Sequence, residues 1–574
     1  MGAMNTTTTY PWLRYYGRVP RSLDYPELTL YQAIAQTAAR TPEAIAWDFV
    51  GKRSNYRDFL AAIDHCAAAF ASLGLRRDER ILISMPTSPQ GIIAFYAASK
   101  LGAVPAMIHP LSTAAEIEYY LNVSAARIAL TLDAFYPVFA SLKLQQPLET
   151  LIIARVPDYL GPLKKFGFWL SSGRKLPRLP ADARVRRWAE MMAASAAGVS
   201  RASTTTDDPA AILFSGGTTG APKGIVLSSR NFIAQGTQAA CWGDIRQGDS
   251  ILAILPIFHG FGLGVCVNAA LMAGATSILV PKFDAKLVAT LLKTKRPSLL
   301  VGVPTLYDAL NRDPSLARAD LSCLRAAFSG ADTLPRPVKE RFEQLVAEHG
   351  GKVKLLEGYG LTEAVTAIMA MPLDEYREGS IGIPFPDMLA KICAPGTTQQ
   401  VAPGEEGEIC VAGPAVMLGY LDDAAATALA LRRHEDGRTW LHTGDLGRMD
   451  ADGFFYFTVR LKRMIKSSGF NVYPAQVEAV LYQHPQVAEA CVIGVPDPAQ
   501  VERVLAYVVL RDPAQATSAT EQALIEHCHQ RLIKWSCPRE VKFRTVLPKT
   551  RVGKIDYRAL AQQHAAHPDS RELV

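Results

Sequence analysis

Short apolar runs alternate with amphipathic stretches along the first 360 residues of the chain. Leu28–Ala38 and Tyr56–Leu73 repeat apolar residues with helical spacing, whereas Arg80–Met85 is short and nearly continuous, which favours a buried strand. Helices are also predicted at Ile92–Leu101 and Ala114–Val123, and strands at Val104–Ile108, Ile128–Leu132, Leu151–Ala154, Ala210–Phe214, Gly224–Ser228, Ile251–Leu255, Ser277–Val280, Ser298–Val303, Ala326–Ser329 and Lys354–Leu356. Such alternation favours parallel sheets covered by helices.

The pattern changes near Asp387, where short alternating strands with Gly and Pro turns predict a small β-rich subdomain. Those strands are Met388–Cys393, Gly407–Val411 and Phe454–Thr458. Beyond Arg460, helices and strands mix again, with Pro474–Tyr482 and Thr520–Ile533 as helices and Glu489–Gly494, Leu505–Leu510 and Glu540–Thr545 as strands. We therefore predict an α/β fold with a first domain over residues 1–459, a second over residues 460–574, and a hinge at Arg460–Lys462.

Composition agrees with a multidomain globular protein. The chain has 574 residues, of which 49% are hydrophobic and 20% are charged, and this length is too great for one core. Its nine cysteines form no CxxC pair, so they predict neither a disulfide framework nor a zinc site, and Cys266, Cys410 and Cys491 lie in apolar runs typical of core residues. The opening residues contain no apolar signal region, which favours a cytoplasmic location.

Residues 251–281 include no Asp, Glu, Lys or Arg, and 31 such residues are long enough to raise the question of a membrane span. Pro256, His259, Asn268 and several glycines interrupt the run. We therefore interpret it as strand, loop, helix and strand in a buried α/β interior.

The net charge of +7 is concentrated in one segment, residues 158–188, which carries a local charge of +6. Eight basic residues (Lys164, Lys165, Arg174, Lys175, Arg178, Arg184, Arg186 and Arg187) accompany Asp158 and Asp182, and Phe166, Phe168, Trp169 and Leu170 lie among them. This mixture is typical of segments that contact anionic membranes, and a solvated basic surface is the alternative. Nucleic-acid binding is not favoured, because the basic residues are confined to this segment and no recognition motif accompanies them.

Phe214–Gly224, with the sequence FSGGTTGAPKG, lies between two predicted strands and has the composition of a phosphate-binding loop. Its glycines (Gly216, Gly217 and Gly220) permit close backbone approach, while Ser215, Thr218 and Thr219 supply hydroxyls and Lys223 supplies a positive charge. The loop does not fit the Walker pattern, because Pro222 blocks a continuing helix and no Ser or Thr follows Lys223. A flexible surface linker is the alternative for this motif alone.

This loop resembles the signature loop of the adenylate-forming superfamily, which includes acyl-CoA synthetases, firefly luciferase and peptide-synthetase adenylation domains. Further motifs in the family's order extend the resemblance from about Leu28 to Leu560. It implies a large N-terminal domain of two stacked α/β sheet subdomains plus the small β-rich subdomain, followed by a mobile α+β C-terminal lid domain. It also implies ATP, Mg²⁺ and coenzyme A as cofactor or co-substrates.

Glu357–Glu363, with the sequence EGYGLTE, resembles the family's YGxTE motif. The resemblance implies that Tyr359 stacks on adenine, and that backbone groups beside Gly330, Ala331, Glu357, Gly358, Gly360 and Thr362 help to bind the nucleotide. Glu363 is the implied Mg²⁺ ligand, with Ser215 as a second, water-mediated contact. A turn that precedes a helix capped by Thr362 is the alternative for these letters alone.

Thr443-Gly444-Asp445 resembles the family's TGD motif, in which the carboxylate accepts hydrogen bonds from the ribose hydroxyls. The segment from Val459 to Pro474 resembles the hinge motif and its following loop. There the resemblance implies Arg460 near ribose and phosphate, Lys462 as the pivot, and Lys466 and Gly469 in the loop that lines a pantetheine tunnel. Val459 and Arg463 replace the Gly and Asp that are common in the family, and we expect these departures to affect local geometry more than chemistry.

His259 and Lys554 complete the implied catalytic set, together with Glu363 and Lys462. His259, in the sequence LPIFHG, is implied to border the acyl pocket and to change orientation between half-reactions. Lys554 lies in a motif resembling the family's terminal one, whose Lys contacts the carboxylate and bridging oxygens during adenylation. For His259 alone, a buried structural residue is the alternative, and Lys554 alone would be a solvated side chain.

The resemblance implies two steps, in which a carboxylate displaces pyrophosphate from ATP and coenzyme A then displaces AMP from the acyl-adenylate. A medium- to long-chain fatty acid is the favoured substrate, because Gly260, Gly262 and Gly264 are expected to leave room for a tunnel beside His259 and the sequence LPIFHGFG contains no Asp to pair with the ammonium group of an amino acid. An aryl or short-chain acid, or an acyl-AMP ligase that loads a carrier protein, are the alternatives. A non-enzymatic binding protein is disfavoured because Lys554 is present.

Overall fold

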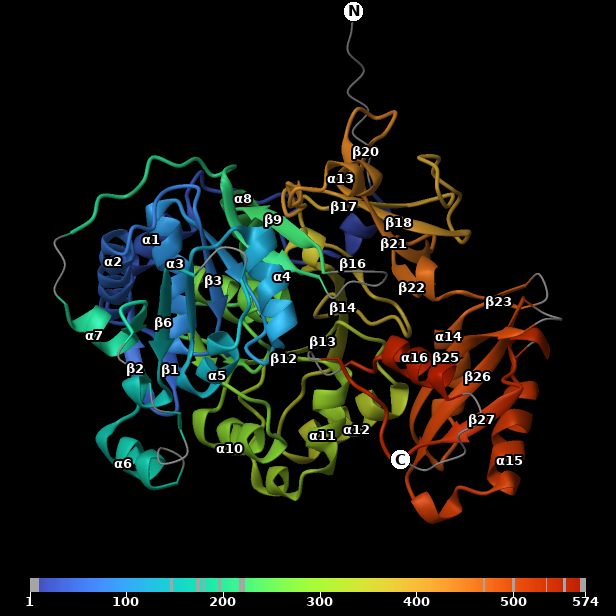
Figure 1. Cartoon of the computed structure of the whole chain (residues 1–574). Helices are drawn as coiled ribbons and strands as arrows, with labels where there is room; N and C mark the ends of the chain where they lie inside the picture. The colour runs from blue at the N-terminus through green and yellow to red at the C-terminus, as the bar shows by residue number, and fades with distance from the viewer. Residues whose placement is uncertain are drawn as a thin grey trace, which may run out of the picture.

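The computed structural model of the chain contains two large β-sheets and two small ones (Figure 1). The structure describes residues 10–144, 148–171, 176–177, 179–180, 182–194, 198–215, 222–467, 470–497, 501–532, 534–550 and 554–567.

The first large sheet has eight strands in the order β19-β9-β8-β4-β3-β5-β6-β7. Neighbours from β8 to β7 are parallel, while β9 and β19 continue the sheet in antiparallel fashion at one edge. The strands are β3 (Arg80–Ser84), β4 (Val104–Met107), β5 (Ile128–Leu132), β6 (Thr150–Ala154), β7 (Val185–Arg187), β8 (Pro209–Phe214), β9 (Gly224–Ser228) and β19 (Gly419–Tyr420).

The second large sheet has nine strands in the order β16-β15-β14-β13-β12-β10-β11-β1-β2. Its centre, from β14 to β1, is parallel, and its edge strands are antiparallel. The strands are β1 (Ile45–Phe49), β2 (Lys52–Asn55), β10 (Ser250–Ala253), β11 (Thr276–Leu279), β12 (Leu299–Gly302), β13 (Ala326–Ser329), β14 (Leu355–Gly360), β15 (Ala367–Ala370) and β16 (Ile383–Pro384).

A layer of helices lies between the two large sheets and packs against both. It contains α1 (Leu30–Arg40), α2 (Tyr56–Ser72), α3 (Pro89–Leu101), α8 (Ser229–Trp242), the π-helix η5 (Phe261–Ala269) and α9 (Ala270–Met272). Every residue of α3 is buried, including the polar Gln90, Ser99 and Lys100. Pro89 occupies its first turn, and Gly102 ends it with φ of +67°. The prediction of stacked sheets is thus confirmed.

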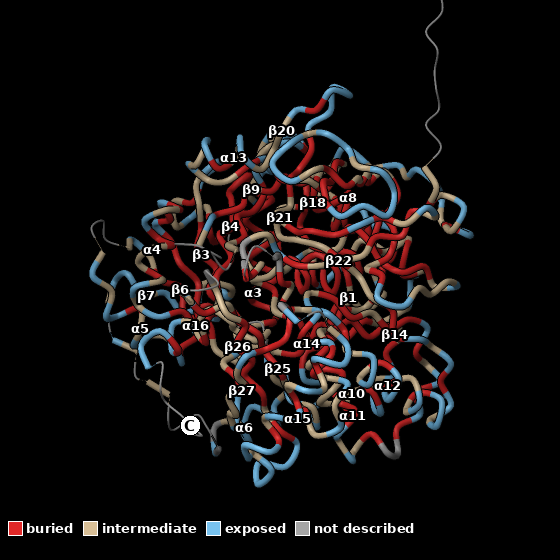
Figure 2. Tube along the Cα trace, turned by 90° about the vertical axis from the view of Figure 1, so that its right-hand side faces the viewer, coloured by how far each residue is buried: buried red, intermediate tan, exposed pale blue. Residues whose placement is uncertain are grey.

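The outer faces of the sheets carry most of the remaining N-terminal helices. On the second sheet these are α10 (Ala285–Lys295), α11 (Pro304–Arg312) and α12 (Arg336–Glu348), and on the first they are α4 (Ala114–Ser124) and α5 (Tyr136–Ala140). By contrast, α6 (Pro162–Ser171) lies beside the β1–β2 turn, where Lys164 donates to the Val50 carbonyl, and α7 (Trp188–Ala193) packs on α2 and buries Trp188 in the core between the sheets. Successive residues of β3 point to opposite faces of the first sheet. Ile81 and Ile83 pack in the core between the two large sheets, whereas Leu82 packs with Ile117 of α4 on the outer face. The strands therefore form the buried interior seen in Figure 2.

Two smaller sheets follow in sequence. The antiparallel one contains β17 (Leu389–Cys393), β18 (Glu406–Ala412), β20 (Leu431–Arg433), β21 (Thr439–Met449) and β22 (Phe455–Arg460), with α13 (Ala424–Ala430) beside it. The C-terminal one contains β23 (Ile465–Ser467), β24 (Phe470–Val472), β25 (Val487–Asp497), β26 (Val501–Leu510) and β27 (Glu540–Phe543), covered by α14 (Pro474–Tyr482), α15 (Ser518–His529) and α16 (Tyr557–Ala566). The latter has cores of its own and lies at the lower right of Figure 1.

The apolar stretch at 251–281 forms β10, η5, α9 and β11, as predicted. Across the part of the chain that the structure describes, no helix is long and apolar enough to traverse a bilayer. Two local differences concern the site. The sequence EGYG continues strand β14 rather than forming a turn, and the TGD residues lie within the long strand β21, which the polarity pattern did not indicate.

Candidate active site

Three of the predicted nucleotide-binding residues meet where β14, β21 and β22 approach one another. The Tyr359 hydroxyl donates a hydrogen bond to Asp445 Oδ2 at 2.7 Å, and Arg460 Nε lies 3.1 Å from Asp445 Oδ1. Asp445 is paired with Arg460 across the β21–β22 ladder. An aromatic ring, a carboxylate and a guanidinium from three strands are therefore held in one cluster.

A bulge in β21 places Asp445 in this cluster. His442 pairs with Cys410 and Leu446 pairs with Glu408, so Thr443, Gly444 and Asp445 face a single residue of β18. Gly444 takes a φ of +72°, which a side chain would disfavour. Burial raises the pKa of Asp445, and Arg460 and the Tyr359 hydroxyl oppose that rise because both stabilise the carboxylate.

Glu363 follows β14 in a short 3₁₀ turn, Thr362–Ala364, and its Oε1 accepts a hydrogen bond from the Tyr420 hydroxyl at 2.9 Å. Burial raises the pKa of Glu363, and Tyr420 and Arg460 act in the opposite direction. Leu361 is the N-cap residue of this turn and Thr362 is its first residue, so Thr362 is not a helix cap here.

Tyr420 also connects Glu363 to the predicted phosphate loop. Lys223 Nζ lies 4.6 Å from the centre of the Tyr420 ring and 3.9 Å from Asp423 Oδ2. At the base of the loop, the Ser215 amide donates to the Lys223 carbonyl at 3.1 Å. Tyr420 and Asp423 are not predicted from the sequence, because the segment Gly-Tyr-Leu-Asp-Asp has no distinguishing pattern.

Gly330, Gly358 and Gly360 occupy tight positions at the ends of β13 and β14. A Cβ at Gly330 would lie 3.2 Å from the Gly358 carbonyl oxygen, and one at Gly360 would lie 1.9 Å from that of Thr366. Ala331 has a positive φ of 73°, which turns the chain sharply after β13. The structure thus brings Gly330 and Gly358 together.

Lys554, from the C-terminal sheet region, reaches the same cluster. Burial lowers the pKa of Lys554, while Asp332 and Asp445 raise it, so this cation faces carboxylates of the N-terminal part of the chain. His259 Nδ1 accepts a hydrogen bond from the Phe261 amide at 3.1 Å. Burial, and then the nearby Lys554, lower the pKa of His259 to about 4, so the ring is neutral at physiological pH.

Arg463 departs from the family pattern and forms a half-buried ion pair with Glu478 of α14. Its guanidinium also lies 4.8 Å from the centre of the Tyr557 ring. Burial lowers the pKa of Arg463, but Glu478 outweighs that effect and the net shift is upward. Arg463 therefore contributes an ion pair and a ring contact within the C-terminal domain, and the expected effect on local geometry stays a prediction.

Several predicted residues lie outside the described part of the chain. These are Gly216, Gly217, Thr218, Thr219 and Gly220 of the phosphate loop and Gly469 of the hinge loop, and the side chains of Lys462 and Lys466 are likewise not described. Their roles remain predictions.

The expectation that Gly260, Gly262 and Gly264 leave room for an acyl tunnel is wrong. A Cβ at Gly260 would lie 1.6 Å from the Val365 carbonyl oxygen, one at Gly262 would lie 2.3 Å from that of Pro256, and one at Gly264 would lie 2.7 Å from Gln235 Oε1. The space that these glycines leave is filled by protein atoms. They allow the start of the π-helix to pack closely against α8 and against Val365 and Thr366, which precede β15.

Glu357 is half-buried at the start of the EGYG sequence, and burial raises its pKa to about 7, while the Tyr376 hydroxyl, 3.2 Å from Oε2, opposes the rise. Because the folded state holds this proton more tightly than the unfolded state does, the stabilisation is complete below pH 4.5 and is lost as pH rises through 7. Glu357→Gln should therefore gain stability relative to wild type by up to about 3 kcal/mol between pH 5 and 8. Thermal unfolding midpoints across that range, with the exposed Glu348→Gln as control, test this; a pH-independent difference would contradict it.

Comparison with known proteins agrees with this geometry. A family model for AMP-binding enzymes matches residues 34–421, and one for the AMP-binding enzyme C-terminal domain matches residues 476–554. A long-chain-fatty-acid–CoA ligase of Bacillus subtilis is 36% identical over 96% of this chain and 98% of its own length, and one of Salmonella typhimurium is 32% identical over 98% and 99%. The structure is similar to that of a benzoate CoA ligase from Burkholderia xenovorans, with a TM-score of 0.79 and 25% identity over 93% of this chain and 99% of that one.

The chain therefore belongs to the AMP-binding enzyme family. Within that family it is an AMP-forming acid–thiol ligase, whose substrates include ATP and coenzyme A. The resemblance, the fold class and the enzyme class predicted from the sequence are confirmed.

Proposed function

We propose that the chain activates long-chain fatty acids in two steps. The fatty acid carboxylate attacks the α-phosphate of ATP and releases pyrophosphate, and the thiolate of coenzyme A then attacks the carbonyl of the acyl-adenylate and releases AMP. The observation that carries this proposal is the convergence of Tyr359, Asp445 and Arg460, from three different strands, and Lys554, from the C-terminal region, on one cluster. Full-length relatives that are long-chain-fatty-acid–CoA ligases support the choice of acid.

The nucleotide would lie against β13, β14 and β21. Tyr359 stacks on adenine, backbone groups from Gly330 to Ala331 and from Glu357 to Gly360 contact its edge, and Asp445 accepts hydrogen bonds from the ribose hydroxyls. Arg460 pairs with Asp445 and adds positive charge next to the phosphates. The loop from Ser215 to Lys223 would bind the triphosphate with its amides and hydroxyls.

Glu363 fits a Mg²⁺ ion, because its carboxylate is held by Tyr420 at the edge of the cluster and hard oxygen ligands suit this cation. Ser215, at the end of β8, would supply a second contact through water. When bound, Mg²⁺ screens the charge of the triphosphate. Tyr420 and Lys223 fix the position of the carboxylate independently of the ion.

Lys554 and His259 border the place where the acid and the α-phosphate would meet. Lys554 stabilises the charge that moves onto pyrophosphate, and neutral His259 orients the carboxylate without repelling Lys554. The observed orientation of the C-terminal domain, residues 460–574, therefore suits adenylation. For thiolysis, this lid would rotate about Lys462, remove Lys554 and bring the loop at Lys466 and Gly469 to the pantetheine arm.

An aryl acid is the second candidate, because the structure is similar to that of a benzoate CoA ligase. A CoA-thioester assay with ATP and a series of acids from acetate to oleate, with benzoate included, separates the two. Preference for oleate supports the proposed substrate, and preference for benzoate would replace it. Indifference to ATP with every acid would overturn the function itself.

We also propose that α6 contacts the surface of an anionic membrane. Leu163, Phe166 and Leu170 recur at helical spacing, and their exposed fractions are 89%, 62% and 50%. Lys164 and Lys165 are exposed on the same helix, which projects from the body at the lower left of Figure 1. An apolar face flanked by lysines suits a bilayer that contains anionic lipids.

We expect the protein to float with liposomes that contain anionic lipid, and to lose most of that binding when Leu163, Phe166 and Leu170 are replaced by Ser. A matched control replaces Leu418 and Leu429, which are exposed on a different part of the surface, by Ser. Equal flotation of all three proteins would contradict the membrane role of α6. Salt-sensitive binding would show the contribution of the lysines.

A further inference from the structure

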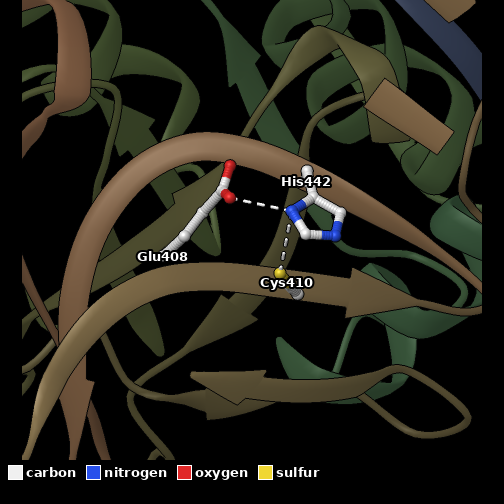
Figure 3. Close-up of side chains that lie close together, drawn as sticks. All are labelled: Glu408, Cys410 and His442. Carbon is white, nitrogen blue, oxygen red and sulfur yellow. Dashed lines mark hydrogen bonds and ion pairs between the residues drawn. The ribbon is translucent and has the colours of Figure 1, made fainter. Parts of the chain in front are cut away.

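A buried polar cluster lies directly behind the bulge that carries Asp445. Figure 3 shows Glu408 and Cys410 of β18 facing His442 of β21. His442 Nδ1 is 2.8 Å from Glu408 Oε2 and 3.5 Å from Cys410 Sγ, and all three residues are at most 7% exposed. Such groups are costly to bury, so their retention in the core calls for a physical reason.

Carboxylate, thiolate and imidazole are ligands that zinc accepts, but the lone pairs here serve hydrogen bonds. Glu408 Oε1 accepts the Gly444 amide at 2.9 Å, and His442 Nε2 lies 2.9 Å from His434 Nε2. The 2.8 Å separation between His442 and Glu408 is a hydrogen-bond length, whereas two such ligands of one tetrahedral ion lie roughly 3.3 Å apart. The cluster is thus a hydrogen-bond network that ends at the bulge.

The order of donors in this network follows from its contacts. Burial lowers the pKa of His434 to about 4, so its ring is neutral and has one N–H to donate. We assign His442 the tautomer that donates from Nδ1 to Glu408, so that its Nε2 accepts from His434. Burial raises the pKa of Glu408, but His442 and the Gly444 amide outweigh it, so the carboxylate stays ionised.

We propose that Glu408 is a positioning residue for ATP, because it holds the bulge in the shape that aims Asp445 at the ribose. The bulge removes the Gly444 amide from the β18–β21 ladder, and Glu408 is the group that satisfies it. Thr443 completes the attachment, because its hydroxyl donates to the Ile409 carbonyl at 2.7 Å and accepts the Asp445 amide at 3.1 Å. This inference rests on the ribose role proposed for Asp445.

Removal of the Glu408 carboxylate leaves the Gly444 amide and His442 Nδ1 without their acceptor inside the protein. Asp445 would then keep Tyr359 and Arg460 but lose the fixed backbone beneath it. A shift of about 1 Å in a binding group can cost roughly a hundredfold. We therefore expect Glu408→Ala to raise the KM for ATP by about tenfold to a hundredfold, with much smaller changes in the KM values for the acid and coenzyme A.

Glu408→Gln is the conservative variant. Its amide oxygen still accepts the Gly444 N–H, and the chain through His442 and His434 can reverse direction because neutral imidazoles exchange tautomers. We expect this variant to recover most of the ATP affinity. Glu435→Gln, on the surface of the same subdomain, is the matched control and should behave as wild type.

The decisive measurement compares kcat/KM for ATP, 2′-deoxy-ATP and 3′-deoxy-ATP in wild type, Glu408→Ala, Glu408→Gln and Asp445→Asn, alongside thermal midpoints. The inference requires Glu408→Ala to lose the preference for ATP over both deoxynucleotides and Glu408→Gln to regain it. A Glu408→Ala enzyme that weakens for all substrates alike but keeps this preference would overturn the inference, as would a stoichiometric metal ion lost only in that variant. If Asp445→Asn itself keeps the preference, the ribose role fails instead, which distinguishes the two failures.

Discussion

Replacing Lys554 by Ala is expected to reduce pyrophosphate release from fatty acid and ATP by at least about a hundredfold to a thousandfold. Lys554 is the cation from the C-terminal domain that faces Asp332 and Asp445, and its charge is held in a site partly shielded from water. A positive charge there stabilises the transition state of adenylation more than it stabilises bound ATP, so its loss should appear in kcat rather than in the KM for ATP.

The same variant should convert a pre-made acyl-adenylate to acyl-CoA at close to the wild-type rate, because the proposed second step takes place with Lys554 rotated away. Lys549→Ala is a matched control five residues earlier, since Lys549 pairs with Glu489 at 2.7 Å on the surface of the C-terminal domain. Equal loss of both half-reactions in Lys554→Ala would contradict the assigned role and indicate damage to the lid instead.

His259 lies near Lys554 and has a lowered pKa. With a pKa of about 4, its ring stays neutral across the range in which fatty acids are ionised, and Lys554 is one cause of that shift. A second cation in this position would repel Lys554 and be poorly solvated. The neutral imidazole is therefore part of the arrangement that allows Lys554 to approach.

The sequence was most informative where a pattern is local. Apolar runs predicted the parallel strands because a buried strand is apolar on both faces, and α3 was also predicted although it is buried on all sides. The nucleotide-binding candidates could be predicted because Tyr359, Asp445 and Arg460 each lie in a short sequence motif that resembles one of the adenylate-forming family. What those motifs touch depends on strand register, which no local pattern contains.

The site residues that the sequence did not predict are brought together by the pairing register of the strands. Glu408 and His442 are 34 positions apart, and only the β18–β21 ladder brings them together. Tyr420 contacts Glu363 because β19 pairs with β9 at the edge of the first sheet. The prediction of an acyl tunnel beside the glycines failed for a different reason. A glycine that makes room for a ligand cannot be distinguished in sequence from one that makes room for a carbonyl group, as Gly260 does.

Replacing Arg463 by Ala is expected to destabilise the C-terminal domain by about 3 kcal/mol, because it leaves the largely shielded carboxylate of Glu478 without its cation. Glu478 Oε1 also accepts the Val492 amide at 2.7 Å, which fixes the carboxylate between α14 and β25 and prevents it from reaching solvent by simple rotation. Thermal or denaturant unfolding of wild type and variant measures the effect. Arg503→Ala, which disrupts the more exposed pair with Glu540, is the matched control and should cost at most about 1 kcal/mol.

The double variant Arg463→Met, Glu478→Leu separates a packing role from a purely electrostatic one. If the cost of Arg463→Ala arises from a stranded carboxylate, replacing both charges by apolar groups of similar size should restore most of the lost stability. A double variant no more stable than Arg463→Ala would contradict that explanation. Since Arg463 follows the proposed pivot Lys462 directly and Asp332 of the N-terminal domain acts on it electrostatically, the double variant should also alter the balance between adenylation and thiolysis. Its two half-reaction rates therefore test whether this ion pair, absent from the common family pattern, biases the lid towards the orientation in which Lys554 is engaged.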